Sequence, residues 1–261
     1  MRWSPFIVTS ALSFFVSGSL AIPAPSNSTS HTLMKRSVVC GQNVRTAVAE
    51  DCLEHRPSLF FALGGTVQRP LITAHQLDPT AQDIPPGAAC DHVVELQVLA
   101  RAMSSSGACA VITALNNLNN PRHILLQPLA DVINGAGNLV FLDSRVNSKK
   151  ASFVVNAMNG ARITTADPLN LAVSGYLRNQ LISTGSNAVA QHLDTLINQI
   201  TAIAKTTADA IPALPQGVRA QGIQIQQQAL KTAVAQLRQL NDRTPVISRW
   251  RRVLGANVVN E

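Results

Sequence analysis

The sequence predicts an α+β fold in which most residues are helical, and three stretches of the chain support this prediction. After Asp167-Pro168 the chain is rich in Ala, Leu, Ile and Gln at helical spacing. Residues 56–89 are instead rich in Pro, Gly and Thr, with brief apolar pieces that predict a loop with one or two short strands. Residues 138–142 form another apolar, strand-like piece after the turn signal Asn134-Gly135-Ala136-Gly137. We therefore expect a few strands beside a large helical region.

The first residues are typical of a secretory signal. Arg2 supplies a positive start, residues 6–16 form a short apolar run, and Ser19-Leu20-Ala21 is a small-x-small cleavage site, which predicts a signal peptide over residues 1–21. The run is shorter than the roughly 20 apolar residues that a membrane-spanning helix needs. No later segment is long and apolar enough, so we expect a secreted, extracellular protein with no stable membrane span.

Residues 22–36 are expected to be a pro-segment. They contain two prolines, several serines and threonines and no Asp or Glu, a composition that cannot form a core. They end in Lys35-Arg36, a dibasic pair of the kind that kexin-type proteases cut in eukaryotic secretory pathways. The mature chain would then begin near Ser37, and the processing signals suggest a fungal source.

The mature chain is less basic than the precursor. It would contain 225 residues, enough for one sizeable core or two small ones. Removal of the precursor residues takes away three basic residues and no acidic ones, which lowers the net charge from +7 to +4. This charge permits contact with polyanions without requiring it.

Four cysteines lie in the mature chain, at Cys40, Cys52, Cys90 and Cys109. An even number of cysteines in an oxidising secretory route predicts two disulfides. Three connectivities are possible, and we favour the local pairs Cys40–Cys52 and Cys90–Cys109. The chain contains no Cys-x-x-Cys pair, which argues against a structural zinc site.

Helical spacing of apolar residues predicts the main helices of the mature chain. They are expected at residues 41–55, 96–103, 109–118, 187–208 and 216–240. Asp167 can cap a further helix, because Pro168 fits its first turn. The chain closes with a basic cluster, Arg249, Arg251 and Arg252, which suits a phosphate or membrane-surface contact or a solvated tail.

Two segments resemble the HNH nucleases of the ββα-metal (His-metal finger) fold. The first runs from Cys90 to Leu96 and contains Asp91-His92 followed by apolar residues; the second runs from Gly137 to Lys150. In that family an Asp-His strand pairs with a second strand that opens with Asn, and the following helix carries another Asn or His with a Lys about one turn later. The resemblance covers roughly residues 90–152 and implies a small ββα-metal core with a helical insertion, followed by a helical C-terminal region.

The resemblance also implies domain limits and a catalytic site. The HNH-like core would span residues 37–163 and the helical region residues 164–261. His92 would be the general base that takes a proton from water, and Asn138 would orient the histidine and its loop. Asp91 and Asn147 would hold one divalent ion through oxygen atoms, a ligand set that suits Mg²⁺ or Mn²⁺.

The same resemblance places positive charge beside the substrate. Arg145, Lys149 and Lys150 would contact phosphate, so a metal-dependent endonuclease acting on DNA or RNA is the function that it implies. The sequence departs from the family in two respects. About forty residues, many of them helical, separate the two segments, and Glu95 stands where Pro is common.

A second interpretation of the same residues remains open. Residues 91–103 can be drawn as one amphipathic helix in which Asp91 only caps the N-terminus and His92 is a surface group. The long Ala, Leu and Gln-rich C-terminal half has no obvious catalytic group. On this interpretation the chain is a non-enzymatic secreted effector or toxin-like protein whose helices bind a partner or a membrane, with or without a degenerate nuclease scaffold.

Overall fold

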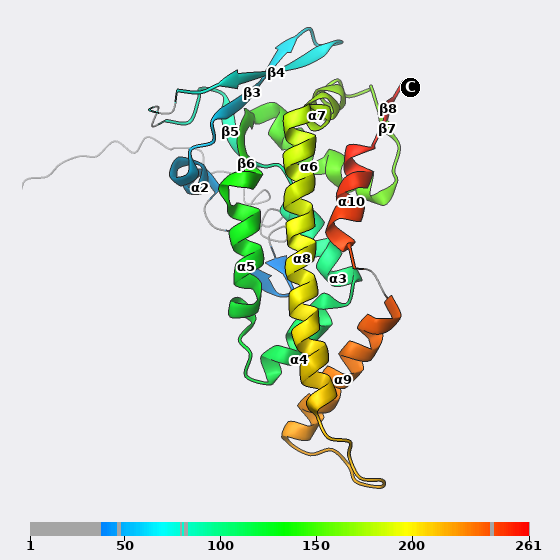
Figure 1. Ribbon diagram of the computed structural model, residues 1–261. Coiled ribbons are helices and arrows are strands. Elements are labelled where there is room, and N and C mark those ends of the chain that lie inside the picture. Colours follow the sequence, from blue (N-terminus) through cyan, green and yellow to red (C-terminus); the bar gives the residue numbers. More distant parts are fainter. Residues whose placement is uncertain (1–37, 46–47, 79, 81–82, 241–242, 261) are drawn as a thin grey trace, which may run out of the picture.

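The computed structural model describes residues 38–45, 48–78, 80, 83–240 and 243–260. The predicted signal peptide and pro-segment lie outside the described residues. Within them the fold is α+β and mainly helical, as predicted (Figure 1). A small sheet lies at one end, and long helices extend away from it.

The helices account for most of the described chain. The α-helices are α2 (Val48–His55), α3 (Leu96–Ser105), α4 (Ala108–Asn117), α5 (Arg122–Asn134), α6 (Ser144–Asn159), α7 (Leu169–Arg178), α8 (Gln180–Ala210), α9 (Ile223–Leu240) and α10 (Pro245–Leu254), and η1 (Ala136–Asn138) is a short 3₁₀ turn. The predicted helices at 96–103, 109–118, 187–208 and 216–240 are confirmed, with somewhat different ends. The capping role of Asp167 is also confirmed, because its carboxylate accepts a hydrogen bond of 2.9 Å from the Leu169 amide.

The strands form one four-stranded sheet and two small pairs. They are β1 (Val38–Val39), β2 (Gln42–Asn43), β3 (Leu59–Gly65), β4 (Pro70–Gln76), β5 (Ala88–His92), β6 (Leu139–Asp143), β7 (Ile163–Thr164) and β8 (Val258–Val259). The order in the main sheet is β4-β3-β6-β5. The β3–β6 pair is parallel, and the β3–β4 and β5–β6 pairs are antiparallel. The region predicted as a loop with short strands therefore contains a regular hairpin of two seven-residue strands.

The predicted helix over residues 41–55 is too long at its N-terminal end. Val38–Val39 and Gln42–Asn43 pair as a tight hairpin, and helix α2 is assigned only from Val48. The turn places Cys40 at φ 49° and Gly41 at φ 82°. Left-handed φ values suit glycine and do not continue into a right-handed helix.

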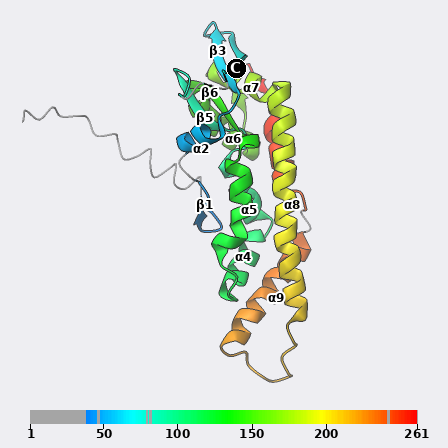
Figure 2. The same cartoon turned by 60° about the vertical axis from the view of Figure 1, so that its left-hand side comes forward.

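One large cluster of buried apolar side chains joins both parts of the chain. It contains Phe61, Leu99 and Phe153 from before residue 164 together with Tyr176 and Trp250 from after it. The boundary predicted at residues 163 and 164 therefore does not separate two cores. A second cluster lies between α4, α8 and α9, and α8 contributes to both clusters along its 31 residues (Figure 2).

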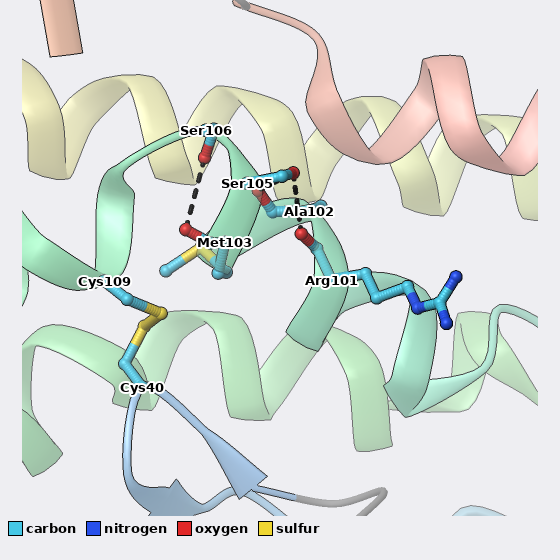
Figure 3. The surroundings of a disulfide bond; sticks show 7 residues. All are labelled: Cys40, Arg101, Ala102, Met103, Ser105, Ser106 and Cys109. Atoms are coloured by element: carbon cyan, nitrogen blue, oxygen red, sulfur yellow. Dashed lines mark hydrogen bonds between the residues drawn. A yellow bond between two sulfur atoms is a disulfide. The ribbon is translucent and has the colours of Figure 1, made fainter. Parts of the chain in front are cut away.

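The disulfides are Cys40–Cys109 and Cys52–Cys90, with Cα–Cα distances of 4.9 and 5.8 Å. The prediction that all four cysteines form two disulfides is confirmed, and the favoured local pairing is wrong. The β1–β2 turn lies against the start of α4, where Cys109 meets Cys40 (Figure 3), and α2 packs on β5 and β6. The pairing follows from packing between segments 69 and 38 residues apart. Two disulfides indicate an oxidising environment.

No single helix among the described residues is long and apolar enough to cross a membrane. Helices α3 and α4 meet the length and composition criteria only as a pair, and they are bent by 78° at the break between them.

Candidate functional site

The two segments of the HNH resemblance lie side by side. Strand β5 ends at Asp91 and His92, which pair with Val140 and Leu139 of the antiparallel strand β6. Helix α6 begins directly after β6, and Asp143 caps it by accepting a hydrogen bond of 3.0 Å from the Arg145 amide. Two antiparallel strands and a following helix therefore surround Asp91. The alternative drawing of residues 91–103 as one helix is wrong, because α3 begins only at Leu96.

Asp91 lies in a closed cluster with Lys150 and Tyr176. The Lys150 ammonium lies 2.5 Å from Oδ1 of Asp91, and the Tyr176 hydroxyl donates to Oδ2 at 2.8 Å. Lys150 also donates to the carbonyl of His92 at 2.6 Å and lies 3.2 Å from the Glu95 carboxylate. The side chain of Asp91 is 2 % exposed and that of Lys150 is fully buried. Both carboxylate oxygens of Asp91 are therefore already occupied by partners within the protein.

Burial and charge act against each other in this cluster. Burial raises the pKa of the Asp91 carboxyl to about 6, although the Lys150 charge acts in the opposite direction. Burial alone would lower the pKa of Lys150, but the carboxylates of Asp91 and Glu95 outweigh it and raise that pKa. Burial also raises the pKa of Tyr176 well above its ordinary value, so the hydroxyl keeps the proton that it donates.

His92 is buried beside Asn134 of helix α5. The amide nitrogen of Asn134 donates to the carbonyls of Val44 and Ala130, at 2.8 and 2.9 Å, which leaves its Oδ1 as an acceptor. Nε2 of His92 lies 2.9 Å from that oxygen and so carries the ring proton, which leaves Nδ1 as the basic nitrogen. Burial lowers the pKa of His92 and keeps the imidazole neutral.

Asn138 connects the chain after β5 to the end of α5. Its Oδ1 accepts from the Val94 amide at 2.8 Å, and its Nδ2 donates to the carbonyls of Val94 and Ile133 at 3.1 and 2.7 Å. The side chain is fully buried. It therefore holds the loop after His92 through backbone groups, and no hydrogen bond joins it to the imidazole in the described part of the chain. The predicted role of Asn138 in orienting the histidine stays a prediction.

The remaining predicted residues lie on α6. Asn147 is half-buried, and the described residues include no hydrogen bond from its side chain to Asp91 or His92. Arg145 pairs with Asp143 at 2.9 Å and Lys149 with Asp167 at 2.7 Å, both near the surface. Lys150 faces the interior instead and cannot reach a phosphate from solvent in this arrangement.

The cluster does not fit a divalent ion as it stands. The ammonium of Lys150 occupies the position beside Asp91 where a cation would sit, and Tyr176 donates to the second oxygen. Within the described ranges, no group of three or more His, Cys, Asp or Glu side chains could hold a metal. The predicted Mg²⁺ or Mn²⁺ site stays a prediction that requires Lys150 to move.

Sequence reasoning missed Asn134 and Tyr176 as members of this site. Tyr176 is the one tyrosine of the chain and stands among small aliphatic residues in α7. A lone phenol in such a stretch is a signal for a buried polar contact, because a buried hydroxyl needs a partner. Its partner, Asp91, is 85 residues earlier in the chain.

Comparison with protein-family models, curated proteins and solved structures finds no match to this chain.

Proposed function

We propose that this protein is a secreted, non-enzymatic effector built on a scaffold that resembles an HNH nuclease. The observation that supports this proposal is the closed contact of Asp91 with Lys150 and Tyr176. A metal-dependent nuclease needs a carboxylate with an open coordination position and a water-accessible base. Here a buried lysine fills the position of the cation, and the cluster stabilises the fold.

Secretion is part of the same proposal. The two disulfides and the signal-like first 21 residues support it together. A disulfide-bonded fold with a core closed around its ionisable residues suits a protein that acts outside the cell by binding.

The competing proposal is an active endonuclease that cleaves DNA or RNA with Mg²⁺ or Mn²⁺. One observation favours it: β5, β6 and α6 bring Asp91, His92 and Lys150 together from two segments about forty residues apart. It requires Lys150 to leave Asp91 when a metal arrives and His92 to become accessible.

One experiment separates the two proposals. The processed protein and its His92→Ala variant are incubated with plasmid DNA and with RNA, in Mg²⁺, in Mn²⁺ and in chelator. We expect no cleavage above the buffer control and no difference between the two proteins. Cleavage that needs the metal and disappears in His92→Ala would overturn the non-enzymatic proposal. His123→Ala, which alters an exposed histidine, is the matched control for that variant.

A further inference from the structure

Strand β4 forms one edge of the four-stranded sheet among the described residues. Along its other side it pairs with β3 without interruption, from Pro70 opposite Gly65 to Gln76 opposite Leu59. Helix α7 packs against this strand, yet five of its seven residues are exposed. The tip of the β3–β4 hairpin extends beyond the helices (Figures 1 and 2). The open side of β4 is therefore available to pair with another strand.

The hydrogen bonds near the two ends of the hairpin show which backbone groups of β4 point outward. Thr66 and Arg69 exchange two backbone hydrogen bonds, at 3.2 and 3.1 Å, and the Leu77 amide donates to the Ser58 carbonyl at 2.8 Å. Bonded pairs alternate along an antiparallel ladder, so β4 bonds to β3 at its odd-numbered positions. The amides and carbonyls of the even-numbered positions between them face away from β3: Ile72, Ala74 and Gln76.

Strand β4 lacks the features that keep most edge strands from pairing. Natural edges carry a charged side chain, an internal proline or a bulge. No Lys, Arg, Asp or Glu lies within residues 70–76, the one proline is the first residue, and the register with β3 contains no bulge. The opposite edge, β5, differs, because α2 and α6 pack against it and the Cys52–Cys90 disulfide joins it to α2. The composition and regular register of β4 thus favour pairing.

The charges that flank β4 would complement each other between two antiparallel copies of the strand. Arg69 precedes the strand and Asp78 follows it, and both are exposed. Antiparallel pairing brings the start of one strand to the end of the other, so each Arg69 would lie near Asp78 of the second copy. Hydrogen bonds from the hydroxyl and the amide of Thr80, at 2.6 and 2.8 Å, hold the Asp78 carboxylate and lower its pKa.

We propose that β4 pairs with β4 of a second copy of this chain, antiparallel and about a two-fold axis at Ala74. In this register Ala74 lies opposite Ala74 of the second copy and Ile72 lies opposite Gln76, so the outward amides and carbonyls of all three gain partners. The uncharged residues 70–76 bring no like charges together. A two-fold axis also repeats the contact of Arg69 with Asp78 at both ends.

The expected dimer is reversible. Interfaces that bury less than about 1,200 Å² are typically weak or transient, and a single pair of strands is a small interface. The open edge lies on β4, which β3 and β6 separate from β5 and its Asp91. The proposal therefore goes beyond the functions proposed above and depends on neither of them.

Sedimentation velocity of the purified protein over a range of concentrations at low ionic strength tests the pairing. We expect a monomer–dimer equilibrium that depends on concentration. Ala74→Pro removes an outward amide at the centre of the pairing and none of the β3–β4 hydrogen bonds, so it should abolish the dimer. The control Val67→Lys alters an exposed residue in the hairpin turn, outside the paired stretch, and should leave the dimer Kd within twofold of the parent value.

Two charge reversals test the antiparallel orientation without a proline. Arg69→Asp places Asp opposite Asp78 of the second copy, and Asp78→Arg places Arg opposite Arg69, so each variant alone should dimerise about tenfold more weakly. An equal mixture of the two variants should recover the parent affinity within about twofold, because each contact across the axis then joins opposite charges. Recovery on mixing also shows that both variants are folded. Arg219→Asp, which reverses an exposed arginine outside the hairpin, is the matched control.

Three results would each overturn the proposal. The first is a protein that stays monomeric at every concentration, and the second is a dimer that persists in Ala74→Pro. The third is a pair of charge-reversal variants that dimerise no better when mixed than alone. An equal effect of Arg219→Asp and Arg69→Asp would likewise assign the dimer to net charge and exclude the contact at the ends of β4.

Discussion

At the scale of single residues, the stability of the protein depends on the partners of the buried Asp91 carboxylate. Asp91 and Lys150 are both removed from water, and each alone would carry a large desolvation cost. The ion pair, the Tyr176 hydroxyl and the His92 carbonyl together satisfy both groups. Loss of Lys150 therefore leaves the Asp91 charge buried without its ion-pair partner, and loss of Asp91 removes the nearer of the two carboxylates that lie beside Lys150.

Substitution Asp91→Asn should destabilise the protein strongly. Among the described residues, Lys150 would keep Glu95, 3.2 Å away, as its one charged partner. We expect the free energy of unfolding at pH 7.5 to fall by about 3 kcal/mol, measured by urea denaturation. The double variant Asp91→Asn/Lys150→Met should recover much of that loss. Lys149→Met, which breaks a partly exposed pair with Asp167, should cost less than about 1 kcal/mol, and an equal loss in Asp91→Asn would contradict the prediction.

His92 should make the stability depend on pH. Burial lowers its pKa below 6.5, the ordinary value that we assign to the unfolded chain. Above pH 6.5 the imidazole is neutral in both states and contributes nothing. As the pH falls below 6.5 the unfolded chain binds a proton that the folded chain does not, so the free energy of unfolding falls.

The raised pKa of Asp91 acts in the opposite direction, because the folded chain then binds the extra proton between pH 6 and 4. A difference measurement separates the two effects. Urea denaturation of the parent protein and of His92→Gln is measured at pH 7.5, 6.5 and 5.5. The free energy of unfolding should decrease less with falling pH in the variant than in the parent protein. An equal decrease in the free energy of unfolding in both proteins would show that His92 does not cause the loss of stability at low pH.

At the scale of elements, α10 depends on a carboxylate from α8. Asp194, which is 4 % exposed, accepts hydrogen bonds from the amides of Val246 and Ile247 at 2.8 and 2.9 Å. The first amides of a helix have no partner within the helix, and a negative charge there also offsets the helix dipole. A residue about fifty positions away thus replaces a local cap, because Thr244 makes no side-chain capping bond.

Substitution Asp194→Ala should therefore loosen α10. We expect a loss of about 2 kcal/mol in the free energy of unfolding, with faster hydrogen exchange at the first amides of α10. Asp209→Ala removes the exposed carboxylate that pairs with Arg238 and should change the stability by less than about 1 kcal/mol. Unchanged exchange in α10 after Asp194→Ala would rule out the capping role.

At the scale of the whole molecule, the disulfides connect segments that the chain order keeps apart. Cys40–Cys109 attaches the β1–β2 turn to α4, and Cys52–Cys90 attaches α2 to the main sheet. The two disulfides close loops of 69 and 38 residues in the unfolded chain. In the loop-entropy model, the entropy that the unfolded chain loses raises the free energy of unfolding by about 4 kcal/mol for each disulfide.

Peptide mapping of the protein without reduction should recover Cys40 joined to Cys109 and Cys52 joined to Cys90. Replacement of Cys40 and Cys109 together by serine should lower the free energy of unfolding by about 2–5 kcal/mol. Recovery of Cys40 joined to Cys52 would contradict the arrangement of β1 and α2 described above.

The sequence by itself determined the α+β class, most helices, strand β6, the cap at Asp167 and the formation of two disulfides. These features depend on apolar periodicity, turn residues and cysteine number, which act within a few residues or through composition. The resemblance to HNH nucleases also led to the segments that meet around Asp91.

Only the tertiary structure decided which side chains of those segments contact one another. Which cysteines pair, that Lys150 faces the interior, and that Tyr176 closes the site depend on contacts between residues 38 to 85 positions apart. Local pattern does not specify such contacts, because they follow from how α2, α6 and α7 pack on the sheet. The packing of α3 on α10 places Arg249 and Arg252 beside a cleft. The sequence had left this basic cluster open as a phosphate contact, a membrane-surface contact or a solvated tail.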